Sequence, residues 1–320
     1  MASAASAVLH WPTASIPLRR VLLATDFSAA SENALRCAAA IARLHGAKLY
    51  LAHVVSSLGF TLTGPEAEQQ AMELAEREAL ELEVKLAYSG ALGGFGHEVV
   101  VRRGCIWDEL QSVVEKESID LLVAGTHGRG GLGKLVLGSV AEEIFRHASC
   151  PVLTVGPCSP AEWSRKKVGA EKTVLFATDF GPACDAALPY AISAARQSGA
   201  KLLLLHVEPF LPEPMRYWYM ADDVVALQSA ARSRSLEQLR VLVPDDLKQQ
   251  AECRVAFGFP GDHILALATS SGADLIVLGL QRVGHGFPAG HLPQSTAYAV
   301  VCGAACPVLT VRIGVTSSGA

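Results

Sequence analysis

The chain repeats itself, and this repeat constrains its fold more than any other feature of the sequence. The segment "RVLLATDFS" at residues 20–28 returns as "TVLFATDFG" at 173–181. The segment "AKLYLAHV" at 47–54 returns as "AKLLLLHV" at 200–207, so both pairs are 153 residues apart. Two copies of one domain in a single polypeptide follow from this constant offset.

The repeat divides the 320-residue chain into two domains, each long enough to bury a core of its own. We expect a disordered leader at 1–17, a first domain at 18–156, a linker at 157–172, a second domain at 173–313 and a tail at 314–320. The leader is small and polar, with no basic start and no sustained apolar core, so it does not resemble a secretory signal.

Within each copy, short leucine-rich and β-branched runs alternate with longer alanine-rich or charged segments. This alternation predicts βαβ units around a parallel sheet. In the first copy we expect strands near 20–25, 47–54, 97–101, 120–125 and 151–155, with helices in the gaps. The strands are almost continuously hydrophobic, which indicates that both faces of the sheet are covered. The predicted fold class is α/β, with two repeated open five-stranded parallel-sheet domains.

The run "PVLTV" follows a cysteine and closes each copy. A short terminal strand after a proline is typical of a sheet edge, where it can pair with another strand. The twin strand is available at high effective concentration because both copies share one polypeptide. We therefore expect the first domain to pair with the second through these terminal strands, while homo-oligomers and a further protein partner are left open.

Composition excludes several classes of function. The 27 basic and 31 acidic residues are interspersed and give a net charge of −4, so no broad field attracts nucleic acid or an acidic membrane. The longest apolar runs are shorter than a bilayer requires. The eight cysteines include no CxxC pair and no zinc spacing, which favours thiols in a reducing compartment. We expect a cytoplasmic protein that binds neither nucleic acid nor membrane.

The stretch "GTHGRGGLGKLVLGS" at 125–139 fits three phosphate-binding patterns. One is the dinucleotide fingerprint GxGxxG, which belongs in the first βα turn and needs an acidic residue about twenty positions later. Here the glycines follow the fourth expected strand, and no such acid follows. The second is the P-loop GxxxxGK, which lacks its Mg²⁺-binding hydroxyl because Leu135 follows the lysine.

The third pattern has better chemistry. Gly125 closes a strand at the carboxyl edge of the sheet, and Gly128 lets the backbone approach a ligand closely. Gly138 and Ser139 begin a helix whose exposed amides suit an anion. The alternative is that Ser139 only caps this helix, with Glu142 completing a capping box, and that the glycines merely make a flexible loop.

"TDFS", the "HV" that closes the second strand, the glycine stretch and "CPVLTV" occur in this order and together resemble the universal stress protein family, in a tandem form. The resemblance implies a five-stranded α/β fold of the adenine nucleotide α hydrolase-like (Rossmann-like) type. ATP-binding members of the family carry a glycine, two residues, a glycine, nine residues, a glycine and a serine or threonine, as the first copy does.

The resemblance also implies roles for single residues. Asp26 is expected near the adenosine, and the main chain of Val54 is expected against the adenine. The implied ATP-binding residues are Asp26, Val54, Gly125, Gly128, Gly138, Ser139 and Val140. For Asp26, the alternative role is the N-cap of a helix that begins at Ser28.

The second copy departs from this pattern. Arg282 replaces the second glycine, the segment up to the serine is two residues longer, and Gln294 precedes Ser295. A side chain at position 282 is expected to obstruct the close approach that glycine allows. Asp179 and Val207 are retained, but we expect this copy to bind nucleotide weakly or not at all.

The sequence offers no clear catalytic group. His53 and His206 end matching strands, and we interpret them as satisfied core histidines because no carboxylate partner is identifiable nearby. The predicted function is an ATP-binding regulatory or stress-protective protein, with ATP as the cofactor and Mg²⁺ left open. The alternatives are slow ATP hydrolysis in the first copy and a nucleotide-independent assembly scaffold.

Overall fold

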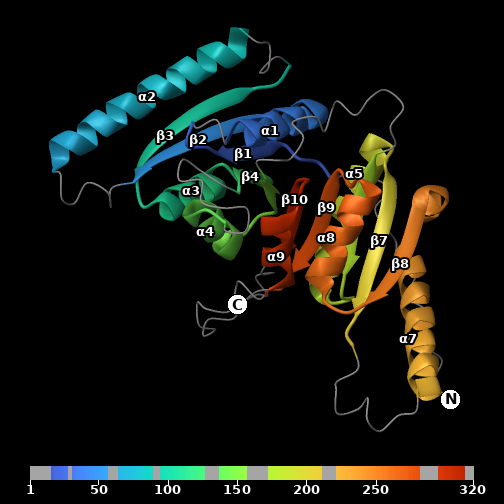
Figure 1. Ribbon diagram of the computed structural model, residues 1–320. Coiled ribbons are helices and arrows are strands. Elements are labelled where there is room, and N and C mark those ends of the chain that lie inside the picture. Colours follow the sequence, from blue (N-terminus) through green and yellow to red (C-terminus); the bar gives the residue numbers. More distant parts are fainter. Residues whose placement is uncertain are drawn as a thin grey trace, which may run out of the picture.

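The computed structural model describes residues 16–27, 31–56, 64–88, 94–126, 137–156, 172–210, 221–281 and 295–313. These residues form one ten-stranded sheet with the strand order β3-β2-β1-β4-β5-β10-β9-β6-β7-β8. Figure 1 shows the two halves of the sheet side by side, with α2 at the outer side of the first repeat and α7 at that of the second. Within the described ranges, no helix is both long enough and apolar enough to span a bilayer.

The elements of the first repeat are β1 (Arg20–Ala24), α1 (Glu32–His45), β2 (Lys48–Ser56), α2 (Pro65–Tyr88), β3 (His97–Gly104), α3 (Ile106–Lys116), β4 (Leu121–Gly125), α4 (Ser139–His147) and β5 (Val152–Val155). Those of the second are β6 (Thr173–Thr178), α5 (Pro182–Ser198), β7 (Lys201–Glu208), α7 (Ala221–Val241), the 3₁₀-helix η3 (Asp245–Gln250), β8 (Ala251–Phe257), α8 (Pro260–Ser271), β9 (Leu275–Leu280), α9 (Thr296–Gly303) and β10 (Val308–Arg312). Every strand pair within a repeat is parallel, which confirms the predicted fold class.

Helix α1 shows how the local sequence makes these elements. Its buried face carries Ala34, Ala38 and Ile41, which recur at the three- and four-residue spacing of a helix. The helix ends at Gly46, whose left-handed φ of 63° lets its N–H donate to the carbonyl of Ala42. Glycine therefore ends this helix because it tolerates a left-handed backbone.

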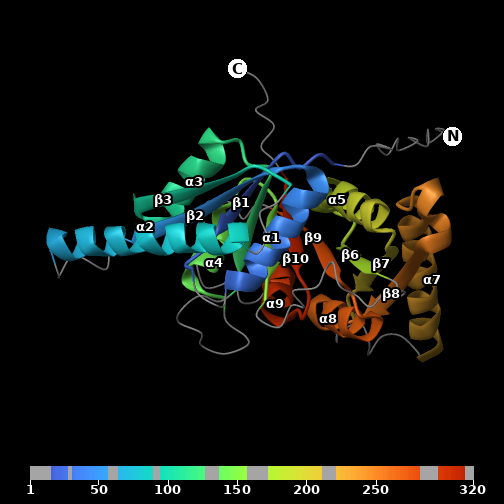
Figure 2. The ribbon, with the colours of Figure 1, turned by 90° about the horizontal axis from the view of Figure 1, so that it is seen from above.

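Helices cover both faces of the sheet, and alternate residues of β1 point to different layers. Val21 and Leu23 belong to a core cluster with residues of α1 and α5, whereas Leu22 belongs to a cluster with residues of α3 and α4. In the second repeat, α7 contributes to the first cluster, and α8 and α9 form a third with β9 and β10. Figure 2 shows the same long arrangement from above, with α2 and α7 at opposite ends.

Strands β5 and β10 join the two repeats. They pair antiparallel, with Leu309 opposite Leu153 at the centre. The buried hydroxyl of Thr154 donates to the carbonyl of Val308 at 3.1 Å, and the hydroxyl of Thr310 donates to the carbonyl of Val152 at 3.3 Å. As a result, the strands that end the two repeats lie in the middle of the sheet, and β3 and β8 form its edges.

Replacing Thr154 by valine tests the contribution of this pairing. Thr154→Val keeps the side-chain shape but removes the hydroxyl that donates to Val308. We expect the free energy of unfolding in urea to fall by about 1 kcal/mol, the typical contribution of one buried hydrogen bond. As a control, Thr269→Val removes an exposed hydroxyl that bonds to Leu265 within α8, and its change should stay below about 0.5 kcal/mol. Equal effects of both substitutions would contradict the expectation.

Candidate functional site

The chain reverses its direction of travel across the sheet between β1 and β4. It runs outward from β1 through β2 to β3 and then returns to β4 on the other side of β1, where Ala24 pairs with Ala124. Open parallel α/β sheets bind ligands at the carboxyl ends of the strands at such a point. Asp26 follows β1 and Gly125 ends β4, so the structure brings these two predicted residues to the same edge.

The glycine stretch begins and ends at this edge. Gly128 and the rest of 127–136 lie outside the described residues, but both ends of the segment are fixed. The N–H of Thr126 donates to the carbonyl of Val155 at 3.0 Å, and the N–H of Gly138 donates to the carbonyl of Thr126 at 2.9 Å. The second bond closes the base of the segment and places the start of α4 beside the end of β4.

The first turn of α4 presents main-chain donors to which no described residue is bonded. Gly138 is the N-cap residue, in an extended conformation, and its carbonyl accepts from the N–H of Glu142 at 2.8 Å. The amides of Ser139, Val140 and Ala141 have no acceptor among the described residues. Together with the positive end of the helix dipole and the exposed side chain of Ser139, they form an arrangement that suits a phosphate.

The alternative of a capping box at this helix is wrong. Ser139 lies one position after the N-cap, so its hydroxyl does not cap the helix. The carboxylate of Glu142 accepts instead from Arg146 of the same helix, at 2.5 and 3.1 Å. In the second repeat the equivalent Ser295 is the N-cap of α9, and its hydroxyl accepts from the N–H of Tyr298 at 3.2 Å. The two matching serines therefore have different local environments.

The loop after β1 is held by its own threonine. The hydroxyl of Thr25 accepts from the N–H of Phe27 at 3.1 Å, and Phe27 has a left-handed φ of 58°. The same hydroxyl lies 3.0 Å from that of Ser31, the residue at the N-cap of α1. Residues 28–30 lie outside the described residues, so the alternative role of Asp26 as the cap of a helix that begins at Ser28 stays a prediction.

The second repeat has the same loop, and the partners of its aspartate lie among the described residues. The hydroxyl of Thr178 accepts from the N–H of Phe180, whose φ is 59°. Asp179 Oδ1 accepts from the N–H of Gly181 at 2.8 Å and from the thiol of Cys184 at 3.1 Å. Asp179 therefore holds the start of α5.

Both predicted core histidines have the partners that this role requires. His53 Nδ1 lies 2.8 Å from the carbonyl of Thr25, and His206 Nδ1 lies 2.8 Å from the carbonyl of Thr178. A carbonyl only accepts, so Nδ1 carries the proton in each ring. Each ring also lies against the phenylalanine of its loop, with ring centres 4.6 and 4.4 Å apart.

The expectation that no carboxylate lies near these histidines is wrong in the second repeat. His206 Nε2 lies 3.6 Å from Glu208 Oε1, which accepts from the buried hydroxyl of Ser235 on α7 at 2.5 Å. Glu208 is two residues further along β7, so it shares a sheet face with His206. The alternation of side chains along a strand was the signal that could have identified it.

Val54 lies where its main chain can reach a ligand. The N–H of Thr25 donates to the carbonyl of Ala52 at 2.9 Å, so the main-chain groups of Ala52 face β1. Main-chain groups alternate sides along a strand, and those of Val54 therefore also point toward β1. Because the pairing of β1 with β2 ends at Ala24 and Ala52, Val54 extends two residues beyond it.

The first glycine of the motif has a packing role as well. Gly279 of β9 is equivalent to Gly125, and a Cβ at this position would lie 2.3 Å from the carbonyl oxygen of Ala183 in α5. The strand end and the helix are too close for any side chain. This explains why the second repeat retains Gly279 although its glycine stretch is altered. Arg282 and Gln294 lie outside the described residues.

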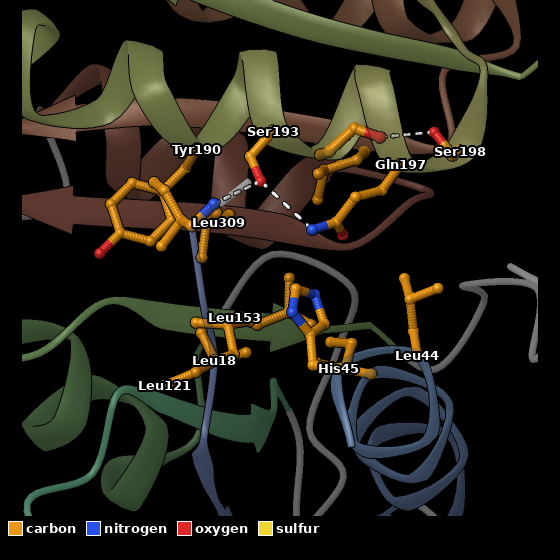
Figure 3. A pocket seen from close by; sticks show the side chains of 14 residues that line it. Leu18, Leu44, His45, Leu121, Leu153, Tyr190, Ser193, Gln197, Ser198 and Leu309 are labelled. Atoms are coloured by element: carbon orange, nitrogen blue, oxygen red, sulfur yellow. Dashed lines mark hydrogen bonds between the residues drawn. The ribbon is translucent and has the colours of Figure 1, made fainter. Parts of the chain in front are cut away.

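A separate hollow of about 80 Å³ lies between α1 and α5 (Figure 3). Leu121, Leu153 and Leu309 line it from the sheet, and His45 and Gln197 face it from the two helices. Burial lowers the pKa of His45, and a hydrogen bond with Gln197 partly opposes this effect. The hollow lies at the amino end of β4, away from Gly138, so it is not part of the candidate nucleotide site.

Metal-binding clusters and reactive thiols are two further kinds of site. The described residues contain no group of three or more His, Cys, Asp or Glu side chains that could hold a metal ion. Burial raises the pKa of Cys37 and of Cys150 to about 11, so both thiols are protonated at neutral pH and are poor nucleophiles.

Comparison with known proteins gives consistent matches. The model of the Universal stress protein family matches residues 17–156 and 171–312. A universal stress protein of Mycolicibacterium smegmatis is 28% identical over 306 residues, covering 91% of this chain and 96% of that protein. Universal stress protein MJ0531 of Methanocaldococcus jannaschii is 32% identical over 138 residues, covering 43% of this chain and 81% of that protein.

A solved structure shows the same fold. The crystal structure of a universal stress protein from Archaeoglobus fulgidus superimposes with a TM-score of 0.64 and 20% identity. The match covers 92% of this chain and 97% of that one. Both repeats are therefore included in the similarity.

Truncation of the two matching serines is expected to affect stability to different extents. Ser295→Ala removes the cap of α9 and should lower the free energy of unfolding by about 1 kcal/mol. Ser139→Ala removes no cap and should change it by less than about 0.5 kcal/mol. Urea denaturation of both variants checks this, and a larger loss for Ser139→Ala would show that Ser139 has a structural role.

The packing role of Gly279 is tested by adding one methyl group. Gly279→Ala places a Cβ against the carbonyl of Ala183 and should lower the free energy of unfolding by about 1–3 kcal/mol. The matched control is Gly261→Ala in α8, where the nearest atom is 3.5 Å away. There the better helix propensity of alanine should raise stability by about 0.5–1 kcal/mol. Thermal unfolding distinguishes the two signs.

Proposed function

The chain belongs to the universal stress protein family, and from this premise we propose that its first repeat binds ATP at the carboxyl edge of β1, β2 and β4. The proposal rests on the hydrogen-bond donors at the start of α4. Three amides with no acceptor among the described residues lie there, beside the exposed hydroxyl of Ser139. They are at the end of a motif that ATP-binding members of the family carry. The bond between Gly138 and Thr126 fixes these donors next to the sheet.

Five of the seven predicted residues contact the ligand or keep its approach clear in this proposal. The amides of Ser139 and Val140 and the hydroxyl of Ser139 donate to the phosphates, while Gly128 keeps their approach clear of side chains. Asp26 accepts from the ribose hydroxyls at the end of β1. The main-chain groups of Val54, which point past the end of β1, pair with the adenine edge.

The second repeat is proposed to bind no ATP. The hydroxyl of Ser295 already accepts from the N–H of Tyr298, whereas Ser139 lies one position beyond the N-cap of its helix. Arg282 stands where the first repeat has Gly128. One ATP per chain follows from this difference.

We propose a regulatory role for this binding. The phosphates contact the ends of the segment 126–138, so occupancy changes the surface that this segment presents to a protein partner. A ligand shifts such an equilibrium only through its different affinity for the two states. The protein would act as a nucleotide-responsive stress protein of the cytoplasm.

Calorimetric titration of the intact chain with ATP should give a stoichiometry near one. Gly128→Arg, which copies the second repeat, should abolish the heat of binding. Ser139→Ala should weaken binding by about tenfold or more, because a hydrogen bond to a charged group contributes about 1.5–3 kcal/mol. Asp26→Asn should weaken it, whereas the matched Asp179→Asn should leave the affinity unchanged.

Further conditions make the titration decisive. Parallel titrations with Mg²⁺ and with EDTA determine whether the metal accompanies the nucleotide. No heat with any adenine nucleotide, or binding that survives Gly128→Arg and disappears with Asp179→Asn, would contradict the proposal. Phosphate release by the wild-type chain well above that of Ser139→Ala would indicate hydrolysis in addition to binding.

A further inference from the structure

We propose that the second repeat holds the phosphate-binding helix α4 of the first repeat in place, with Tyr298 and Arg312 as positioning residues. The inference concerns the regulation of the ATP site and rests on the function proposed above. Neither residue belongs to the candidate site, and both lie more than 150 positions after α4 in the sequence. The second repeat contacts α4 at both of its ends.

The amino end of α4 is anchored in the core of the second repeat. Leu137, the residue before the N-cap Gly138, is only 3% exposed and belongs to a core cluster with Tyr298 and Val301 of α9. Cys302 of α9 also packs against this cluster. The N–H of Gly138 bonds to Thr126, so residues 137 and 138 are fixed by both repeats at once.

The carboxyl end of α4 is anchored by the same repeat. Phe145 is 3% exposed in this cluster, and its ring meets that of Tyr298 edge to face, with centres 6.1 Å apart and an interplanar angle of 74°. Arg312, the last residue of β10, donates from Nη2 to the carbonyl of Phe145. Its guanidinium also lies 6.0 Å from the centre of the Phe145 ring. A cation at a helix carboxyl end is favourable because of the helix dipole.

The two anchors lie at opposite ends of one nine-residue helix. Figure 1 shows α4 and α9 beside each other at the centre of the molecule, where β5 meets β10. Tyr298 shares one core cluster with Leu137, which precedes the amino end of α4, and its ring meets that of Phe145 near the carboxyl end. The position of α4 is thus determined by the second repeat as well as by its own sheet.

The first repeat does not offer the same side chains to α9 of the second. By the alignment of 149–155 with 305–311, the position equivalent to Tyr298 is Glu142, and the position equivalent to Arg312 is Gly156. The carboxylate of Glu142 binds Arg146 of its own helix. The first repeat therefore lacks the aromatic ring and the guanidinium that the second repeat provides.

Such support would increase affinity for ATP without any contact to it. Donors that are already fixed lose little conformational entropy when a ligand binds, so binding is more favourable. Loosening α4 would move the amides of Ser139 and Val140 out of register with the phosphates. A second repeat without a nucleotide site of its own would still be needed for tight binding in the first.

The test uses the full chain and two measurements. In Tyr298→Ala, which removes the ring and the hydroxyl, amide hydrogen exchange at 139–147 should become faster and ATP affinity should fall by about three- to tenfold. Arg312→Gln, a milder change at the end of β10, should speed exchange near Phe145. The control Leu239→Ala removes a fully buried side chain of α7 on the other face of the sheet, and should affect neither measurement.

The outcomes separate this inference from the proposed function. Unchanged exchange and unchanged affinity in both Tyr298→Ala and Arg312→Gln would overturn the inference and leave the ATP site intact. A wild-type chain that binds no ATP would overturn the proposed function. Hydrogen exchange would then still decide whether the second repeat holds α4. Equal losses in Leu239→Ala would show a general destabilisation and also overturn the inference.

Discussion

The antiparallel pairing of β5 with β10 is the contact on which the rest of the structure depends. It converts two five-stranded parallel sheets into one ten-stranded sheet and removes two exposed edges. Because the two strands run in opposite directions, α4 and α9 meet on the same face beside the seam. The packing of Phe145 against Tyr298 follows from this arrangement, and so does the place of Leu137 in the core of the second repeat.

The two repeats have the same fold but different local chemistry. Each keeps the threonine-held loop after its first strand and the histidine that bonds to it. They differ at the helix that ends the glycine stretch, since Ser295 caps its helix and Ser139 does not. Gly279 shows that the first glycine of the motif also has a packing role. The fold therefore requires a glycine at this position independently of any ligand.

The strands could be predicted because each is a short hydrophobic run of neighbouring residues. The end of α1 at Gly46 could also be predicted, because glycine tolerates a left-handed φ. The partners of His206 could be predicted only in part. Glu208 follows from the alternation along β7, but Ser235 comes from α7, and no local pattern in the sequence brings these two together. The capping box at Ser139 was wrong because a serine three residues before a glutamate fits both the N-cap and the first helical position.

The sequence by itself determined the duplication, the parallel α/β halves and the residues that the first repeat brings to the carboxyl edge of its sheet. These properties depend on periodicity and on short motifs, which act over a few residues. Only the tertiary structure decided which serine caps its helix and that both ends of α4 contact the second repeat. Contacts such as that of Phe145 with Tyr298 depend on where the β5–β10 pairing places two distant helices, and the spacing of residues along the chain does not encode that position.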